Sequence, residues 1–217
     1  FEKYVKDVDG IKQNIFENKN DDSLPSLSCN HHKPNSLLQA IVTWADWMSA
    51  GIDRCSQGFE LEDQANSDSI KWGKNRYKQI PLYSVFNKVN GGNYQNAFSL
   101  SKLSIAAKRC YPRKINYPSD GISQQLYKQH WNEFIQELDN LPTNNFQGYF
   151  ETLLSLLKRY AWCIPSNTND MADVSLYDHL KTTAAFAQCL YDYYCDNTDA
   201  FNWDGTRLSV AENHYPI

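Results

Sequence analysis

Apolar side chains recur with helical spacing in four parts of this chain. Between residues 175 and 195 they return at alternating steps of four and three, which marks one face of an α-helix: Leu176, Leu180, Thr183, Ala187, Leu190 and Tyr194. The same periodicity predicts helices near 36–50, 122–139 and 146–161. We therefore expect an all-α domain with short irregular or extended segments.

Capping residues define where two of these helices begin and end. Ser175 is a good N-cap, and Asp178 three residues later completes a capping box and places a negative charge in the first turn. Pro34 marks the start of the 36–50 helix, and Gly51 is expected to be its C-cap.

The remaining segments have weaker patterns. We expect a helix interrupted by glycine over 4–16, a polar surface excursion over 55–78 and a short extended segment over 79–89. A short helix is predicted over 98–110, and the polar tail 196–217 is expected to be extended. The length of 217 residues suggests one domain, or one domain with an appendage.

The helix over 175–195 contains several small residues: Thr182, Thr183, Ala184, Ala185 and Ala187. Such small side chains let a second helix approach closely. We expect this face to pack against the 36–50 helix, with Ala184 and Ala187 at the contact.

Composition narrows the class of protein. A formal charge of −4 and a pI of about 5.7 give no case for a general nucleic-acid-binding surface. The six cysteines form no C-x-x-C pair, so free thiols in a reducing cytosol are expected. The sequence shows no membrane-spanning run and no signal peptide, which also favours a cytoplasmic protein. Because the first residue is Phe1, we expect a piece of a longer protein or a processed one.

Four side chains are candidate ligands for a divalent metal: His31, His32, Asp46 and His179. Imidazole and carboxylate together suit Mn, Fe, Co, Ni or Zn. An acid in the middle of an apolar helix is costly unless it is exposed, paired or bound to a cation. A shared cation predicts that the His179 imidazole lies within about 5 Å of the Asp46 carboxylate, with His31 or His32 in the same cavity.

Each of these residues also has an explanation without a metal. A histidine pair in a polar loop is usually solvated, Asp46 can pair with Arg54, and His179 can be exposed or hydrogen-bonded. Trp44 and Trp47, which flank Asp46, are expected to pack in the core.

Two long motifs resemble a known family. HHKPNSLLQAIVTWADWMSAGIDR at 31–54 and SLYDHLKTTAAFAQCLY at 175–191 are similar to the HD domain of the large signature subunit of type III CRISPR–Cas effector complexes. In that family the HD motifs are circularly permuted. PLYSVFNKV at 81–89 and DGTRLSVAENHYPI at 204–217 fit it as well.

The resemblance implies a fold and a set of site residues. It implies an HD-superfamily-like helical domain over 1–195 and a linker over 196–217 that leads toward a palm domain outside this sequence. It also implies that His179 and Asp46 are the catalytic metal ligands, and that His31 or His32 supports a second metal or the substrate phosphate. Asp178 would then lie behind the ligands, without contacting the metal itself.

The resemblance further implies an activity and partners. The HD domain would be a metal-dependent nuclease on single-stranded DNA, in a complex with other subunits and a guide RNA. The metal is expected to be a divalent transition metal: Mn, Ni, Co, Fe or Zn. The full-length subunit would also make cyclic oligoadenylates.

The sequence departs from the family pattern in two ways. It contains no His-Asp dipeptide, since Asp178-His179 has the reverse order, and it contains no GGDD motif. The dipeptide is expected upstream of Phe1 if the chain is a fragment, and otherwise the site has decayed. Two alternatives therefore stay open: an inactive structural module that braces the effector complex, and an HD phosphohydrolase that acts on small nucleotides.

Overall fold

The computed structural model describes residues 22–55, 80–89, 91, 95–116, 120–167 and 172–211, without the side chains of residues 52–55, 107 and 108. The helix predicted over 4–16 lies outside these ranges, as does the surface excursion predicted over 55–78 apart from Cys55.

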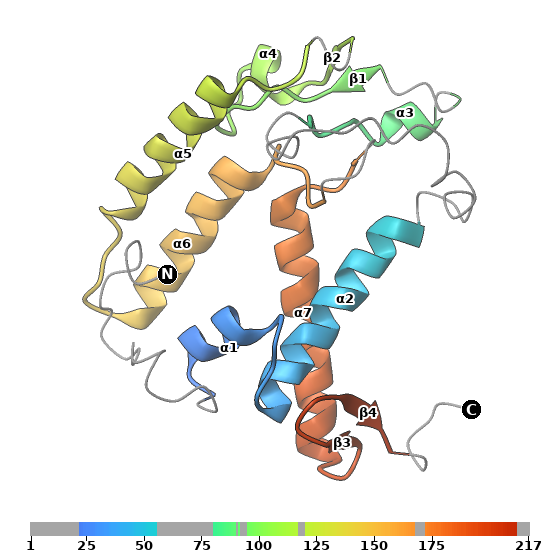
Figure 1. Ribbon diagram of the computed structural model, residues 1–217. Helices are drawn as coiled ribbons and strands as arrows, with labels where there is room; N and C mark the ends of the chain where they lie inside the picture. Colours follow the sequence, from blue (N-terminus) through green and yellow to red (C-terminus); the bar gives the residue numbers. More distant parts are fainter. Residues whose placement is uncertain are drawn as a thin grey trace.

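The four predicted helices are present, and the expectation of a mainly helical domain is confirmed. They are α2 (Leu37–Cys55), α5 (Gln124–Leu138), α6 (Phe146–Ala161) and α7 (Leu176–Asp196). Figure 1 shows α7 crossing α2 in antiparallel fashion, while α5 and α6 lie next to each other on one flank. The C-cap predicted at Gly51 is wrong, because α2 continues through this residue to Cys55.

Side-chain caps explain where α2 and α7 begin. The Ser175 hydroxyl accepts a hydrogen bond from the backbone N–H of Asp178 at 3.0 Å, as the capping box predicts. Ser36 plays the same part for α2, where its hydroxyl accepts from the backbone N–H of Gln39 at 3.2 Å.

Short elements connect the long helices: α1 (Leu24–Asn30), α3 (Phe86–Val89), α4 (Ala107–Cys110), β1 (Asn96–Ala97), β2 (Arg113–Lys114), β3 (Phe201–Trp203) and β4 (Leu208–Val210). Strands β1 and β2 form one antiparallel pair, and β3 and β4 form another. These two strand pairs lie near opposite ends of the molecule (Figure 1).

The helix predicted over 98–110 is present only in its last turn, α4. The backbone before α4 bonds to other segments instead. The N–H of Phe98 donates to the carbonyl of Leu82 at 2.8 Å, and the N–H of Leu103 donates to the carbonyl of Arg159 at 2.8 Å. Because these donors are already satisfied by neighbouring segments, the stretch gains nothing from a helix of its own.

The β3–β4 hairpin packs on α2. Ala200, Phe201 and Leu208 are buried in one cluster with Ala40 and Ile41. Ala200, Phe201 and Leu208, which lie in the stretch predicted as a linker, therefore contribute to the core of the described structure. The domain boundary at residue 195 stays a prediction.

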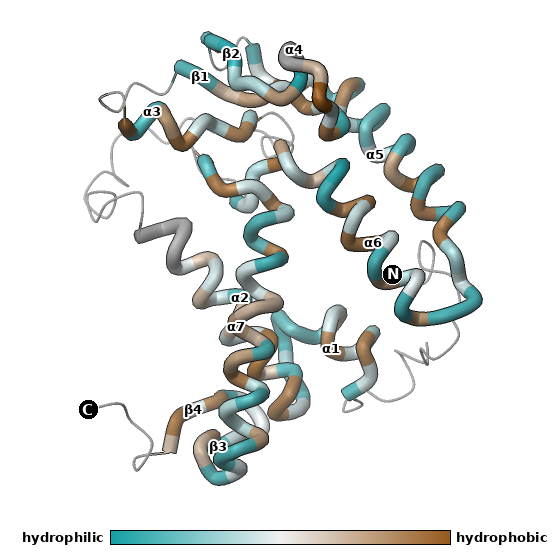
Figure 2. The backbone as a smooth tube through the Cα atoms, turned by 180° about the vertical axis from the view of Figure 1, so that it is seen from behind, coloured by the Kyte–Doolittle hydropathy of each residue, from teal (hydrophilic) through white to brown (hydrophobic). Residues whose placement is uncertain are grey.

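Helix α7 packs against α2, as predicted, and this contact is the most extensive between any two described elements. Figure 2 shows apolar and polar residues alternating along α7. Thr183 and Ala187 are half-buried, but Ala184 is exposed, so its predicted place at the contact is wrong. Each residue turns the helix by about 100°, which carries Ala184 away from the face that Thr183 shares with Ala187.

Two further expectations concern cysteines and membranes. All of the cysteines whose side chains the structure describes are free thiols: Cys29, Cys110, Cys163, Cys189 and Cys195. Burial raises the pKa of the Cys163 thiol to about 11, which makes this cysteine a poor nucleophile.

Among the described helices, none has the length and apolar character needed to span a membrane.

A polar cluster at Glu137 joins α5, α6 and the segment before α4. Its carboxylate accepts from Lys102 at 3.1 Å, from Arg159 at 2.7 Å and from the Tyr160 hydroxyl at 2.7 Å. Partial burial alone would raise the pKa of Glu137, but the hydrogen bonds from Tyr160 and Lys102 outweigh it and hold this pKa below its usual value.

This cluster predicts a pH-dependent loss of stability in Glu137→Gln. A lowered folded pKa stabilises the protein above the unfolded pKa, and the benefit is lost as pH falls through the folded value. The variant should therefore be less stable than the parent by on the order of 1 kcal/mol near neutral pH. The difference should shrink in acid. Denaturant unfolding across pH measures it, with the exposed Glu151→Gln as control. A difference that grows in acid would contradict the assignment.

Candidate metal centre

Asp46 and His179 meet where α2 crosses α7. Asp46 lies in the middle of α2, and His179 lies in the first turn of α7. The His179 Nε2 atom is 3.1 Å from the Asp46 Oδ1 atom, and both side chains are mostly buried. The predicted proximity of these two residues, 133 positions apart, is therefore confirmed.

Ser49 holds the His179 ring from the other side. Its Oγ atom is 2.8 Å from His179 Nδ1 and 3.2 Å from the carbonyl oxygen of His179. Ser49 follows Asp46 by three residues on α2, so both side chains lie on the same face of that helix. The ring is thus fixed at Nδ1 by Ser49 and faces Asp46 with Nε2.

When the His179 ring is neutral, the single proton of the Ser49 hydroxyl allows two arrangements. If it goes to His179 Nδ1, then Nε2 carries the ring proton and donates it to Asp46. If it goes to the His179 carbonyl, then Nδ1–H donates to Ser49 and the Nε2 lone pair faces Asp46. A lone pair opposite a carboxylate is favourable only when a cation stands between them. The same ring can therefore serve as a hydrogen-bond partner or as a metal ligand.

The two adjacent histidines come from the turn that follows α1. His31 Nδ1 is 2.6 Å from the carbonyl oxygen of Ser28, which can only accept. Nδ1 therefore carries the ring proton, and the neutral ring presents its Nε2 lone pair. The Thr43 hydroxyl of α2 donates to the carbonyl of His31 and ties the turn to the helix. The ring centroids of His31 and His32 are 4.0 Å apart.

His31, His32 and Asp46 form one cluster of possible ligands. Each offers one ligand atom, and all of these atoms lie within 4.8 Å of one another. The donor set is two nitrogens and one oxygen, with the His179 nitrogen beside the same carboxylate. Such a set suits Mn, Fe, Co, Ni or Zn, whereas Mg and Ca prefer oxygen alone. The residues present thus fit a divalent transition metal.

The structure bears on three further residues named from the sequence: Asp178, Trp44 and Trp47. The carboxylate of Asp178 accepts from the Ser175 hydroxyl at 2.7 Å, within the cap of α7, and its role behind the ligands stays a prediction. Trp44 packs edge-on against Phe201, as expected of a core residue. Trp47, in contrast, is 63% exposed, so the prediction that it packs in the core is wrong.

Sequence reasoning missed three supporting residues: Ser28, Thr43 and Ser49. One signal was available for Ser49, since its spacing of three from Asp46 places both on one helix face. Ser28 and Thr43 act on His31 through the backbone carbonyl of Ser28 and the hydroxyl of Thr43. Contacts of this kind involve backbone carbonyl groups and cannot be predicted from the pattern of side chains.

No family model matches the chain. Its sequence is similar to curated proteins named CRISPR system single-strand-specific deoxyribonuclease Cas10/Csm1, subtype III-A. It is 31% identical to the one from Methanocaldococcus jannaschii over 194 residues, which is 83% of this chain and 22% of that protein. It is 31% identical to the one from Enterococcus italicus over 184 residues, with coverage of 77% and 22%. It is 29% identical to the one from Streptococcus thermophilus over 164 residues, with coverage of 75% and 20%.

The chain spans only about a fifth of the length of these relatives. The similarity nevertheless extends over most of its own residues, and it agrees with the resemblance found in the two long motifs. The chain belongs to the Cas10/Csm1 family, in which it corresponds to a portion of the full-length protein.

Proposed function

We propose that this chain forms part of a metal-dependent nuclease centre that cleaves single-stranded DNA in a type III CRISPR effector complex. The observation that carries the proposal is the position of Asp46, which forms one ligand cluster with His31 and His32 and also contacts His179 where α2 crosses α7. The names of the relatives, which describe them as single-strand-specific deoxyribonucleases, support the choice of substrate.

The chemistry of the centre follows from its ligands. When bound, the metal would lower the pKa of a coordinated water and neutralise charge on the scissile phosphate. Asp46 supplies the negative charge that favours a cation, and His31 presents a lone pair at Nε2. Ser49 orients His179 so that its Nε2 faces the same carboxylate. We assign Asp46 and His179 as catalytic ligands, with His31 and His32 as supporting ligands.

The proposal extends to the full-length protein. An HD dipeptide upstream of Phe1 would complete the centre. Other subunits and a guide RNA would hold the protein in the effector complex, and palm domains outside this sequence would make cyclic oligoadenylates. These activities are not assigned to the residues of this chain.

Metal binding tests the centre directly. Calorimetric titration of the 217-residue chain with Mn²⁺, Co²⁺ or Ni²⁺ should show binding that Asp46→Ala weakens by more than about tenfold, because the anionic ligand is lost. His31→Ala should weaken it as well. Asp196→Ala, which removes an exposed acid at the far end of α7, should have no effect. Equal affinity in parent and Asp46→Ala would contradict the centre, and absence of metal binding would favour the structural module.

Ser49→Ala tests the orientation of His179. The change leaves a mostly buried imidazole nitrogen without its partner, so it should cost about 1–3 kcal/mol of unfolding free energy. It should also weaken metal affinity by about tenfold or more, as other losses of groups that orient ligands do. Ser155→Ala, at an exposed position on α6, is the control. Unchanged metal affinity in Ser49→Ala would show that this hydroxyl does not position a ligand.

Substrate profiling separates the nuclease from the phosphohydrolase. The full-length protein that carries this chain, supplied with the metal that binds best, should cleave circular single-stranded DNA and leave nucleoside mono- and triphosphates intact. Asp46→Ala should remove the cleavage. Hydrolysis of small nucleotides without cleavage of DNA would favour the phosphohydrolase instead.

A further inference from the structure

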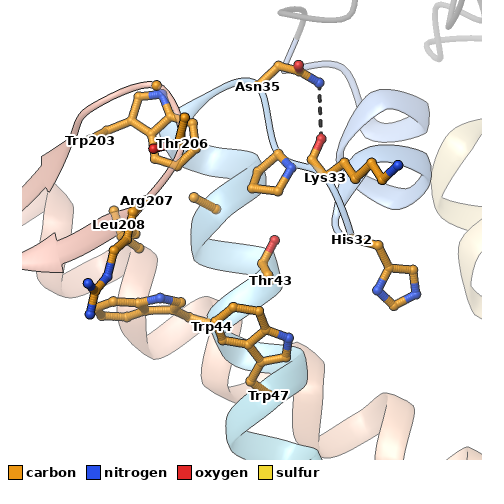
Figure 3. Close-up of a pocket in the computed structure, with 13 residues that line it drawn as sticks. His32, Lys33, Asn35, Thr43, Trp44, Trp47, Trp203, Thr206, Arg207 and Leu208 are labelled. Atoms are coloured by element: carbon orange, nitrogen blue, oxygen red, sulfur yellow. Dashed lines mark hydrogen bonds between the residues drawn. The ribbon is translucent and has the colours of Figure 1, made fainter.

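A cavity of about 620 Å³ lies beside the candidate metal centre. Three parts of the chain line it: the turn after α1, one side of α2 and the β3–β4 hairpin (Figure 3). His32 belongs both to the lining of this cavity and to the ligand cluster with His31 and Asp46. The cavity and the metal centre therefore share a wall.

Three tryptophans line the cavity: Trp44 and Trp47 from α2 and Trp203 from β3. Trp44 and Trp47 are three residues apart, which places their indoles side by side on one face of the helix (Figure 3). Trp44 is held in place by its edge-on contact with Phe201, at a centroid distance of 6.0 Å. Trp47 has no such role in the core and exposes most of its ring, so it is available to a ligand.

The charge of the lining favours an anion. Lys33 and Arg207 contribute cationic side chains from opposite sides of the cavity (Figure 3), and the lining described by the structure contains no acidic residue. Neither cation forms a salt bridge with another described residue. This local balance contrasts with the net charge of −4 for the whole chain.

The tip of the hairpin is built to hold Arg207 at the cavity. The Asp204 carboxylate accepts from the backbone N–H groups of Thr206 at 2.8 Å and of Arg207 at 2.7 Å. Gly205 between them has φ +93°, a left-handed conformation that favours glycine. The hydrogen bond from the Thr206 hydroxyl, together with those from the backbone, lowers the pKa of Asp204, so the carboxylate remains ionised and the turn remains closed.

We propose that this cavity binds single-stranded DNA, with bases stacked on Trp47 and Trp203 and the phosphates near Lys33 and Arg207. The inference rests on the proposed function, because it names the path by which the substrate reaches the metal centre. Aromatic platforms flanked by cations bind single strands, since every unpaired base offers a free face for stacking. In a duplex both faces of each base are already stacked. The shared wall at His32 would bring the bound strand to the metal centre.

The test measures binding apart from cleavage. Fluorescence anisotropy of a labelled oligothymidylate is followed with the 217-residue chain in the presence of a chelator, so that no metal contributes. Trp47→Ala should weaken binding by about fivefold to a hundredfold, the range for one base on one ring. Trp47→Phe should restore most of the affinity. Tyr111→Ala, which removes an equally exposed aromatic ring (69%) outside the cavity, should leave binding unchanged.

The dependence of DNA affinity on salt concentration tests the phosphate contact. The logarithm of the association constant falls linearly with the logarithm of the salt concentration. In Arg207→Ala this fall should be less steep by about 0.7, the value for one phosphate contact on a single strand. Lys158→Ala, an exposed cation on α6, should leave the slope unchanged. Duplex DNA of the same length should bind more weakly than the single-stranded oligonucleotide.

The outcomes separate this inference from the proposed function. If Trp47→Ala binds oligothymidylate as well as the parent while metal binds at Asp46, the cavity is not the path of the strand and the metal centre still stands. If Trp47→Ala loses binding but the chain takes up no metal, the cavity stands and the nuclease centre fails. Equal or tighter binding of duplex DNA would overturn the inference.

Discussion

The packing of α2 against α7 is the contact on which the rest of the structure depends. It places Asp46 and Ser49 of one helix against His179 of the other, and it thereby closes a polar centre between two apolar faces. At the opposite end of the same helix pair, the β3–β4 hairpin packs against Ala40 and Ile41. One helix contact therefore positions both the ligands of the candidate metal centre and the wall of the cavity beside it.

The helices were predictable because their signals are local. A period of 3.6 residues and a capping box within four residues are enough to define α7. The 98–110 segment was not predictable in this way, since its backbone bonds to residues such as Leu82 and Arg159 that are distant in sequence. The exposure of Ala184 shows a related limit: composition indicates that a helix can be approached closely, but not which side is approached.

The candidate site likewise contains residues that the sequence identified and residues that only the structure revealed. His31, His32, Asp46 and His179 were identified by residue type and by resemblance to a family, because no local pattern links positions 133 residues apart. The supporting contacts of Ser28 and Thr43 with the His31 turn depend on backbone atoms and appeared only in the structure. The exposure of Trp47 likewise depends on tertiary packing, which partly buries Trp44 against the hairpin and leaves Trp47 exposed on the cavity wall.

The central claim is that the crossing of α2 and α7 holds a transition metal. The most direct measurement is anomalous X-ray diffraction from crystals of the chain grown with Mn²⁺, Co²⁺ or Ni²⁺. Our account predicts an anomalous peak about 2.0–2.2 Å from an oxygen of Asp46 and from imidazole nitrogens of His31, His32 or His179. A peak elsewhere, with the direct hydrogen bond between Asp46 and His179 intact, would contradict it.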